Sequence, residues 1–280
     1  MATSTYSAIS TLVGEIYEIA LMNATEQNIM APLVTTWNDT QSSQPRMWAT
    51  YSGGTFGATA ETADLSSQAL TPAAAGTATP AVYAQQIVLS NRRIKSDPMG
   101  ARNEAGIYLG NGAAEHIDTN LAGLFSSFTG GTVGTAGGTL TWANVFRAQA
   151  YMRANKVPGS YVAVFRPEQW YYLNAATSGV PTLLQSNQGF MDSVLRPFYQ
   201  GSYSGIDFLV DANITSGTAA VAGMFARPAV YLDIRQPFVI QPEYDASLAG
   251  NGAWELNASL EYAYGVFRPT YGVQMIGTSS

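Results

Sequence analysis

Residues 254–266 read Trp-Glu-Leu-Asn-Ala-Ser-Leu-Glu-Tyr-Ala-Tyr-Gly-Val, and every even-numbered position in this stretch is apolar. The odd-numbered positions begin with Glu255, Asn257, Ser259 and Glu261. This alternation predicts a β-strand with one buried face and one solvated face. At about 3.3 Å per residue the strand spans about 40 Å, roughly twice the usual length.

The segments on either side predict how this strand is paired. Residues 238–244 form a second strand-like stretch, and the loop 245–252 separates it from the first. The two stretches together predict a long antiparallel hairpin. Pro269 interrupts the pattern, and residues 271–276 predict a last short strand.

Upstream, residues 97–128 carry the clearest helical pattern. Asp97 is placed to cap the helix, and Pro98 suits its first position. Because the first half contains glycines, each of which weakens a helix by about 0.5–1 kcal/mol, we expect a bend or break near 110–112. Apolar residues recur in the second half at Ala114, Ile117, Leu121, Leu124, Phe125 and Phe128.

Residues 46–90 lack the composition that builds a core. Short apolar runs stand at 47–51 and 82–89, whereas 52–80 are mostly Gly, Ala, Thr and Ser with two charges, Glu61 and Asp64. A connection of about thirty residues is too long for an ordinary loop in a compact domain. The pattern predicts a projecting β-hairpin that a neighbour orders, with a flexible surface insertion as the alternative.

The N-terminal region and the middle of the chain supply the remaining elements. Apolar residues between 9 and 20 predict a helix before Pro32, either in an N-terminal arm outside the core or as the first helix of the domain. Gly-rich residues 130–138 predict a flexible linker and a sub-domain boundary. The α/β section that follows has predicted helices at 141–156 and 167–175 and predicted strands at 161–165, 206–210, 219–225 and 230–234.

Composition excludes several classes of protein. Only 11% of the 280 residues are charged, against about 25% in an ordinary soluble domain. The absence of Cys and the single His exclude thiolate and His-rich metal sites, and we expect no cofactor. A net charge of −6 disfavours a protein that coats nucleic acid. A neutral, aromatic-rich surface remains, which suits extensive contact with other protein.

The sequence shows no targeting or membrane segment. The N-terminal residues lack the basic region and apolar core of a signal peptide, and no stretch approaches the roughly 18–20 apolar residues of a spanning helix. We therefore expect synthesis in a cytosol and no membrane partner.

The titratable residues do not form a catalytic pattern. His116 would have to serve any Ser–His–Asp triad, yet it lies inside the strongest helix, and a surface or interface role is favoured. Glu255 and Glu261 are too far apart on one strand to act as paired carboxylates. Glu115 and Asp118 are neighbours on a helix face, which is typical of a solvated edge. An enzyme is not expected.

Residues 92–95, Arg-Arg-Ile-Lys, form the one basic cluster. Too few charges are present for sustained binding to nucleic acid. Ion pairs with a neighbouring acidic chain are favoured over local surface charge.

The order of these features resembles the major capsid protein of tailed bacteriophages, which has the HK97-like fold. An N-terminal arm leads to a Gly/Ala/Thr-rich hairpin and a long helix, and a compact α/β section precedes a long β-hairpin. Two local runs carry the similarity as well, Val-Phe-Arg-Pro-Glu at 164–168 and Tyr-Ala-Tyr-Gly-Val-Phe-Arg-Pro at 262–269. The resemblance covers essentially the whole chain.

This resemblance implies an α+β fold in four parts. Residues 1–45 correspond to the N-terminal arm, and 46–90 to the extended E-loop hairpin that lies across an adjacent subunit. Residues 91–129 with 236–268 correspond to the peripheral domain, which holds a long spine helix and a long β-sheet. Residues 130–235 with 269–280 correspond to the axial α/β domain, whose loops meet at five- and six-fold axes.

The resemblance also implies contact residues and a function. Copies would form hexamers and pentamers that close into an icosahedral phage head around double-stranded DNA, in a virion made in a bacterial cytoplasm. Implied partners are a portal protein, a scaffolding protein and optionally a decoration protein. The candidate interface residues are Trp48, Tyr51, Tyr83, Arg92 and Arg93 on the hairpin and its base, and Asn251 in the loop that corresponds to the P-loop at three-fold contacts.

The sequence departs from the family pattern in two ways, and each departure gives a further expectation about how the shell is built. Some members join a Lys of the E-loop to an Asn of the P-loop in another subunit, but residues 46–90 contain no Lys, so no isopeptide link is expected. Some members begin with a long charged scaffolding region. Met1 stands only some forty residues before the hairpin, so we expect a separate scaffolding protein.

Two other functions stay open at the level of sequence. A tail-tube, fibre or surface-layer subunit would share the low charge and the β content, although internal repeats would be expected in it. A hydrolase would need a cleft with converging titratable groups, which the sequence does not supply.

Overall fold

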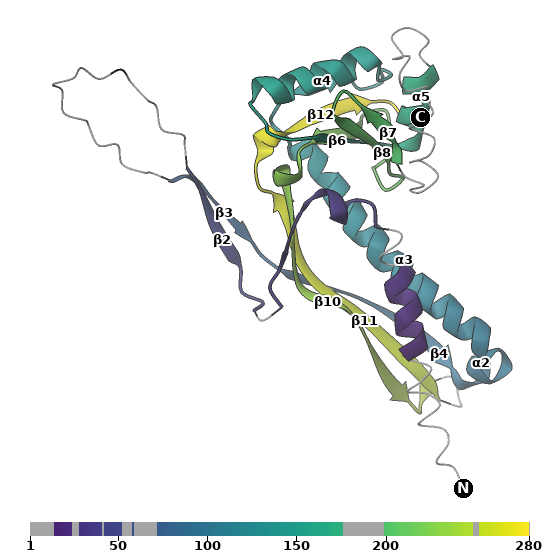
Figure 1. The fold of residues 1–280 in the computed structure, drawn as a ribbon. Coiled ribbons are helices and arrows are strands. Elements are labelled where there is room, and N and C mark those ends of the chain that lie inside the picture. Colours follow the sequence, from purple (N-terminus) through teal and green to yellow (C-terminus); the bar gives the residue numbers. More distant parts are fainter. Residues whose placement is uncertain are drawn as a thin grey trace.

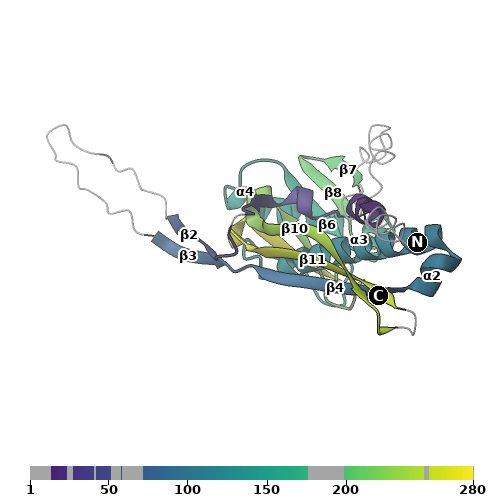
Figure 2. The ribbon, with the colours of Figure 1, turned by 90° about the horizontal axis from the view of Figure 1, so that it is seen from below.

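The computed structural model describes residues 14–23, 28–40, 42–51, 58, 72–175, 199–248 and 252–279. The four-stranded sheet runs alongside one long helix, α3 (Pro98–Gly123), and the six-stranded sheet stands at the C-terminal end of this helix (Figures 1 and 2). A narrow two-stranded ribbon leaves the body to one side. The molecule is therefore elongated, with a separate projection.

The four-stranded sheet is built on the long hairpin that the alternating pattern predicted. β10 (Val230–Asp245) pairs antiparallel with β11 (Ala253–Val266), and the strand order is β1-β10-β11-β4. Two strands were predicted at 230–234 and 238–244, but β10 is continuous. Its register shifts on both sides of Gln236, next to Pro237, because proline cannot donate to the ladder. The outer strands are β1 (Thr35–Asn38) and β4 (Ala81–Ser90).

α3 begins as predicted but does not break. Asp97 accepts a hydrogen bond from the Gly100 N–H at 2.9 Å, and Pro98 occupies the first turn. The expected break near 110–112 is wrong, because α3 is one helix through to Gly123, followed by the 3-10 turn η2 (Leu124–Ser127). A Cβ on Gly110 would overlap the carbonyl oxygen of Ala20, so this glycine lets a second helical segment, residues 14–23, pack closely.

The N-terminal segment packs on α3 and then joins the four-stranded sheet. Ile16 and Ala20 are fully buried against Leu109. After the 3-10 turn η1 (Ala31–Leu33), β1 pairs in parallel with β10. The segment thus contributes to two of the hydrophobic clusters of the described residues.

Asp118, which was expected on a solvated edge of the helix, is fully buried. Its carboxylate accepts hydrogen bonds from the backbone N–H groups of Ile29 (2.9 Å) and Met30 (3.0 Å). The expectation was wrong because the N-terminal segment covers this face of α3.

The second sheet has six strands in the order β5-β12-β9-β6-β8-β7. The linker predicted at 130–138 is partly ordered, because β5 pairs in parallel with β12. β7 was not predicted. The strands are β5 (Thr132–Gly134), β6 (Tyr161–Phe165), β7 (Tyr199–Tyr203), β8 (Ile206–Val210), β9 (Ala220–Phe225) and β12 (Gly272–Gly277).

Helices cover one face of this sheet, and the end of α3 covers the other. α4 (Trp142–Ala154) and α5 (Pro167–Ala175) pack on the first face through a cluster around Trp142. On the opposite face Phe125, Phe128 and Phe225 form an aromatic triad with ring centroids 5.7–5.8 Å apart. α3 therefore joins the two sheets through one continuous core. The remaining short elements are α2 (Asn91–Ser96), η4 (Arg227–Ala229) and η6 (Pro269–Tyr271).

The projecting ribbon consists of β2 (Arg46–Tyr51) and β3 (Pro72–Ala78), which pair antiparallel. The strand expected at 82–89 is present as β4, but it pairs with β11 rather than with residues 47–51. The projection therefore ends at about residue 78, and the chain returns directly into the four-stranded sheet.

Candidate functional site

The β2–β3 ribbon is the feature that a monomer explains least. It extends away from both sheets (Figure 1), and the Met47 side chain is 79% exposed. A two-stranded ribbon is marginally stable by itself in water. Its direction must therefore be held at its root, where it joins the four-stranded sheet.

Aromatic side chains form the first part of that root. The Trp48 ring lies 4.9 Å from the Tyr231 ring and 5.5 Å from the Phe267 ring, measured between centroids. Trp37 of β1 stacks on Tyr231 at 5.3 Å. Gly76 pairs with Trp48 across the ribbon, and a Cβ there would overlap the indole. These four rings, the root cluster, fix β2 against β1 and β10.

Four charged side chains form the second part, the root network. Arg235 is 3% exposed at its side chain and contacts Asp233 at 2.8 Å and Asp39 at 3.0 Å. Arg46, the first residue of the ribbon, contacts the same Asp233 at 3.2 Å. Its guanidinium also lies over the Trp37 ring, 5.0 Å from the centroid. Two arginines thus share two carboxylates, and the ribbon is tied to β10 at its base.

The root network was missed at the level of sequence, although one signal for it existed. Tyr231, Asp233 and Arg235 alternate along β10, which places an aromatic ring and both charges on one face. Asp39 and Arg46 carry no local pattern, because they reach this face only through the pairing of β1 with β10.

Two predicted contact residues pack within their own chain. Trp48 belongs to the root cluster, and Tyr83 lies 4.5 Å from the His116 ring and 4.7 Å from the Tyr262 ring. Burial raises the pKa of Tyr83, and Tyr264 adds to the effect. A subunit contact for either residue stays a prediction.

Of the other predicted contact residues, Tyr51 lies on the ribbon, and Arg92 and Arg93 lie on α2. Tyr51 pairs with Pro72 through the backbone of the ribbon. Arg92 is exposed on α2, and the Arg93 guanidinium contacts Glu104 at 2.6 Å. Asn251 lies outside the described residues. Their roles in assembly stay predictions.

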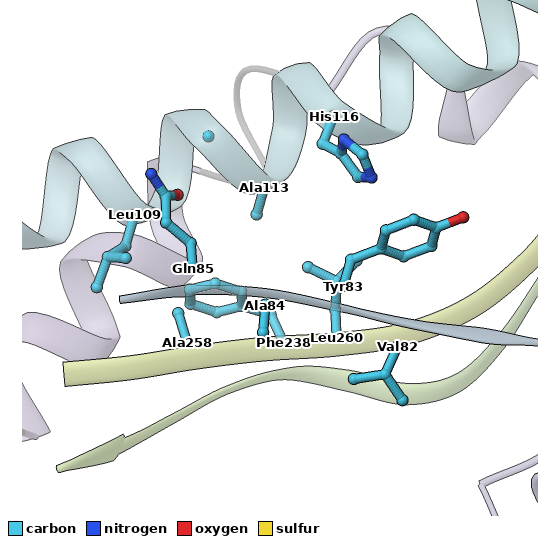
Figure 3. A pocket seen from close by; sticks show the side chains of 11 residues that line it. Val82, Tyr83, Ala84, Gln85, Leu109, Ala113, His116, Phe238, Ala258 and Leu260 are labelled. Atoms are coloured by element: carbon cyan, nitrogen blue, oxygen red, sulfur yellow. The ribbon is translucent and has the colours of Figure 1, made fainter. Parts of the chain in front are cut away.

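Two grooves lie along α3. One, of about 400 Å³, runs between α3 and the four-stranded sheet, with Leu109 and Ala113 above it and Phe238 below (Figure 3). The other, of about 410 Å³, is bounded by β4, α2 and α3. Both are lined mainly by apolar side chains, which suits contact with protein more than acid–base chemistry.

The described residues offer no arrangement for metal chemistry. Among them no three His, Asp or Glu side chains converge in a way that would hold an ion. Within the same residues, no helix is long and apolar enough to cross a membrane.

Comparison with known proteins gives one family and a consistent set of structures. A family model described as phage capsid protein matches residues 74–275. The search of curated proteins found no match. Among solved structures, the chain is similar to the capsid of cyanophage P-SCSP1u, with 14% identity and a TM-score of 0.64 over 89% of this chain and 87% of that chain.

Two further structures show the breadth of the likeness. The capsid of Ralstonia phage GP4 has 9% identity and a TM-score of 0.67 over 89% of this chain and 87% of that chain. A virus-like particle from Pyrococcus furiosus has 9% identity and a TM-score of 0.61 over 94% of this chain and 98% of that chain. At such identities the likeness shows the fold alone, and the expected α+β, HK97-like fold is confirmed.

Proposed function

The chain belongs to the phage capsid protein family, and on that basis we propose that its copies assemble as hexamers and pentamers into an icosahedral head around double-stranded DNA. The coarser expectations, a structural capsid protein of the virion and a homo-oligomer, are confirmed. The proposal concerns how the copies are arranged and what they enclose.

One observation carries the proposal: a ribbon with a fixed root projects from the body, and the described residues of its own chain leave side chains such as Met47 exposed along it. Such a projection has a complementary surface elsewhere on the same molecule, which makes the contact between copies heterologous. Heterologous contacts close into rings at fixed rotations. Many modest contacts per subunit then add up to a resilient shell.

The domain assignment belongs to the same proposal. Residues 46–90 contain the E-loop, of which 46–78 project and 81–90 return into the four-stranded sheet as β4. Residues 91–129 with 236–268 act as the peripheral domain, and 130–235 with 269–280 as the axial domain that faces the symmetry axes. Residues 1–45 act as the N-terminal arm. The hairpin of β10 and β11, the length of α3 and the separate six-stranded sheet support this division.

Electron microscopy of the purified protein tests the arrangement. We expect rings of five and six subunits and closed shells, with the protein alone or together with portal, separate scaffolding and decoration proteins of the same phage. Monomers that never form rings or shells under any of these conditions would overturn the proposal.

We further propose that the shell is held without isopeptide cross-links. The chain has two lysines, Lys95 and Lys156, and both lie outside residues 46–90. Assembled shells boiled in SDS should give one band at the subunit mass of 29.8 kDa. A ladder of covalent oligomers would contradict the proposal.

A further inference from the structure

Basic and acidic residues are unevenly distributed along the chain. Residues 129–167 and 262–280, which include β5, α4, β6, η6 and β12, hold five of the 13 Lys and Arg residues and none of the 19 Asp and Glu residues. The net charge of −6 therefore combines a basic region with a more acidic remainder. Such a region attracts anions locally even though the protein as a whole is acidic.

The two basic stretches meet where the C-terminal end of α4 packs against η6. The Asn155 side-chain amide donates to the carbonyl oxygen of Gly130 at 2.8 Å and to that of Thr270 at 3.5 Å. One turn earlier on α4, the Tyr151 ring packs on Gly131 so closely that a Cβ there would overlap it. The end of α4, the segment before β5 and η6 therefore form one continuous surface.

Three exposed cations on this surface, Arg147, Lys156 and Arg268, form the basic patch. The Arg147 guanidinium lies 5.6 Å from the centroid of the Tyr151 ring, and its Nε donates to the Tyr151 hydroxyl at 3.2 Å. The Arg268 guanidinium lies 5.1 Å from the centroid of the Tyr271 ring, and its Nη1 donates to the Tyr271 hydroxyl at 3.0 Å. No carboxylate of the described residues forms an ion pair with any of the three cations, so the tyrosines orient two guanidinium groups whose charge stays available to an anion.

The basic patch has the chemistry of a phosphate-binding surface more than that of a protein interface. Large apolar side chains anchor the centre of a protein interface, and among the described residues none of the exposed large apolar side chains lies in 129–167 or 262–280. Neither groove along α3 includes a residue of the patch. A guanidinium matches phosphate oxygens with two parallel hydrogen bonds, and an ammonium attracts phosphate as a point charge. A polymer with repeated phosphates can therefore contact all three cations at once.

We propose that the basic patch of Arg147, Lys156 and Arg268 binds backbone phosphates of the packaged double-stranded DNA. The inference rests on the proposed function and adds which surface of the subunit faces the DNA. Duplex DNA carries about one negative charge per 1.7 Å of its axis, so the contact needs no particular base sequence. Three cations on an acidic protein make each contact weak and sensitive to salt, and the shell repeats it at every subunit.

Binding of unassembled subunits to a short labelled DNA duplex of arbitrary sequence tests the charges, with fluorescence anisotropy measured at several salt concentrations. Arg147→Gln with Arg268→Gln should lower the affinity at low salt by roughly tenfold or more, because two phosphate contacts are lost. The slope of log affinity against log salt should become shallower by about 1 for each contact removed. A wild-type protein without affinity for the duplex at low salt, or a double variant that binds as the wild type does, would overturn the inference.

Two further variants separate the patch from general effects of charge and packing. Arg92→Gln with Lys95→Gln makes the same change in charge on exposed residues of α2, at the opposite end of the molecule from α4 (Figures 1 and 2), and should bind the duplex within about twofold of the wild type. Arg147→Lys with Arg268→Lys keeps both charges and should keep the salt slope of the wild type. Equal losses of affinity in the α2 variant, or in the lysine variant, and in the glutamine variant of the patch would overturn the inference. Urea unfolding of each variant shows whether a loss of binding is a loss of the fold.

The two lysines of the chain allow the contact to be mapped in filled heads. Lys156 belongs to the basic patch, whereas Lys95 lies on α2. Formaldehyde joins lysine amines to DNA bases that lie close to them, so heads filled with DNA should yield nucleotide adducts on the peptide of Lys156 and not on that of Lys95. Adducts at Lys95 alone, or none at Lys156, would overturn the inference.

Assembly without DNA separates this inference from the proposed function. The Arg147→Gln, Arg268→Gln variant should form empty rings and shells at the same protein concentration as the wild type. If only the variant fails to assemble, the patch joins copies of the chain and the inference is overturned. If the wild type itself forms no rings or shells, the proposed function fails, while the affinity of the subunit for the duplex still decides whether the patch binds phosphates.

Discussion

Asp118 shows how one buried carboxyl fastens the N-terminal segment to the spine of the molecule. It replaces water as the acceptor for two backbone N–H groups, those of Ile29 and Met30. Burial raises the pKa of Asp118 to about 7, although these two hydrogen bonds act to lower it. The ordinary value is 3.8, so the folded subunit holds this proton more tightly than the unfolded chain does.

The stability of the subunit should therefore depend on pH in a defined direction. The contribution of protonated Asp118 is fully present below about pH 4 and is lost as the pH rises through about 7, because between these values the folded state binds the extra proton. Asp118→Asn does not titrate and satisfies one N–H instead of two. We expect it to cost about 1–3 kcal/mol, and to cost more at pH 5 than at pH 7.5.

Urea unfolding of unassembled subunits at the two pH values measures this dependence. Glu115→Gln removes an exposed carboxyl from the same helix and serves as the control, with an effect of about 0.5 kcal/mol or less. A cost for Asp118→Asn that is larger at pH 7.5 than at pH 5 would show that the ionised carboxylate is the stable form.

Two glycines of α3 give a second prediction about single residues. Alanine should lower the free energy of unfolding at one of these positions and raise it at the other. Gly110 faces the carbonyl of Ala20, whereas a Cβ on Gly123 would meet nothing within 4 Å. Gly110→Ala should lower the free energy of unfolding by about 1–3 kcal/mol, since the two helices must separate. Gly123→Ala should raise it by about 0.5–1 kcal/mol, the ordinary gain in a helix. Thermal unfolding of both variants checks the pair, and stabilisation by Gly110→Ala would mean that residues 14–23 do not pack here.

These residues also show the limit of local reasoning from sequence. The cap at Asp97 was predictable because Asp-Pro at a helix start is a local signal. The buried state of Asp118 and the reason for Gly110 were not, because both depend on residues about ninety positions away. A glycine that permits close packing and a glycine that breaks a helix look alike in one sequence.

At the scale of elements, the root network decides how firmly the ribbon is held. Asp233 is fully buried between two arginines, whereas the Asp39 side chain is 40% exposed. Asp233→Asn leaves Arg235 charged and buried without its nearest counter-ion, and should cost about 3–5 kcal/mol. Asp39→Asn removes a more exposed partner and should cost about 1 kcal/mol or less.

Hydrogen exchange of the ribbon reports on this difference. Amides of 46–51 and 72–78 should lose more protection in Asp233→Asn than in Asp39→Asn, relative to amides of β6 in the same protein. No loss of protection in either variant would show that the root cluster of aromatic rings holds the ribbon without the charges. Equal loss in the two variants would contradict the larger role expected of Asp233.

Elements differed in how well the sequence predicted them. The strand 254–266 and its partner follow from alternation and one short loop, so both the elements and their pairing were predictable. The strand-like run at 82–89 was predicted, and it lies in β4, but its pairing with β11 was not predicted, because the paired residues are about 160–180 positions apart in sequence. Composition alone made 46–90 look like one hairpin, when only 46–78 project.

At the scale of the whole molecule, the proposed function assigns folding and assembly to different parts of the chain. The four hydrophobic clusters of the described residues draw on both sheets, on α3 and on the ribbon root. Part of the shortage of charge in the sequence falls in residues 52–71, where Glu61 and Asp64 are the only charged residues. We propose that this segment serves contact between copies.

Replacement of residues 52–71 by Asn-Gly should separate the two functions. Tyr51 and Pro72 are already paired, so a two-residue turn closes the ribbon without strain in its ladder. We expect a monomer with unchanged circular dichroism. Its midpoint of thermal unfolding should lie within about 3 °C of the wild type, because the replacement should change the free energy of unfolding by about 1 kcal/mol or less. Electron microscopy should show no shells at concentrations where the wild type assembles. Shells of normal yield would mean that the segment is dispensable for contact between copies, and a chain that no longer folds would place it in the core.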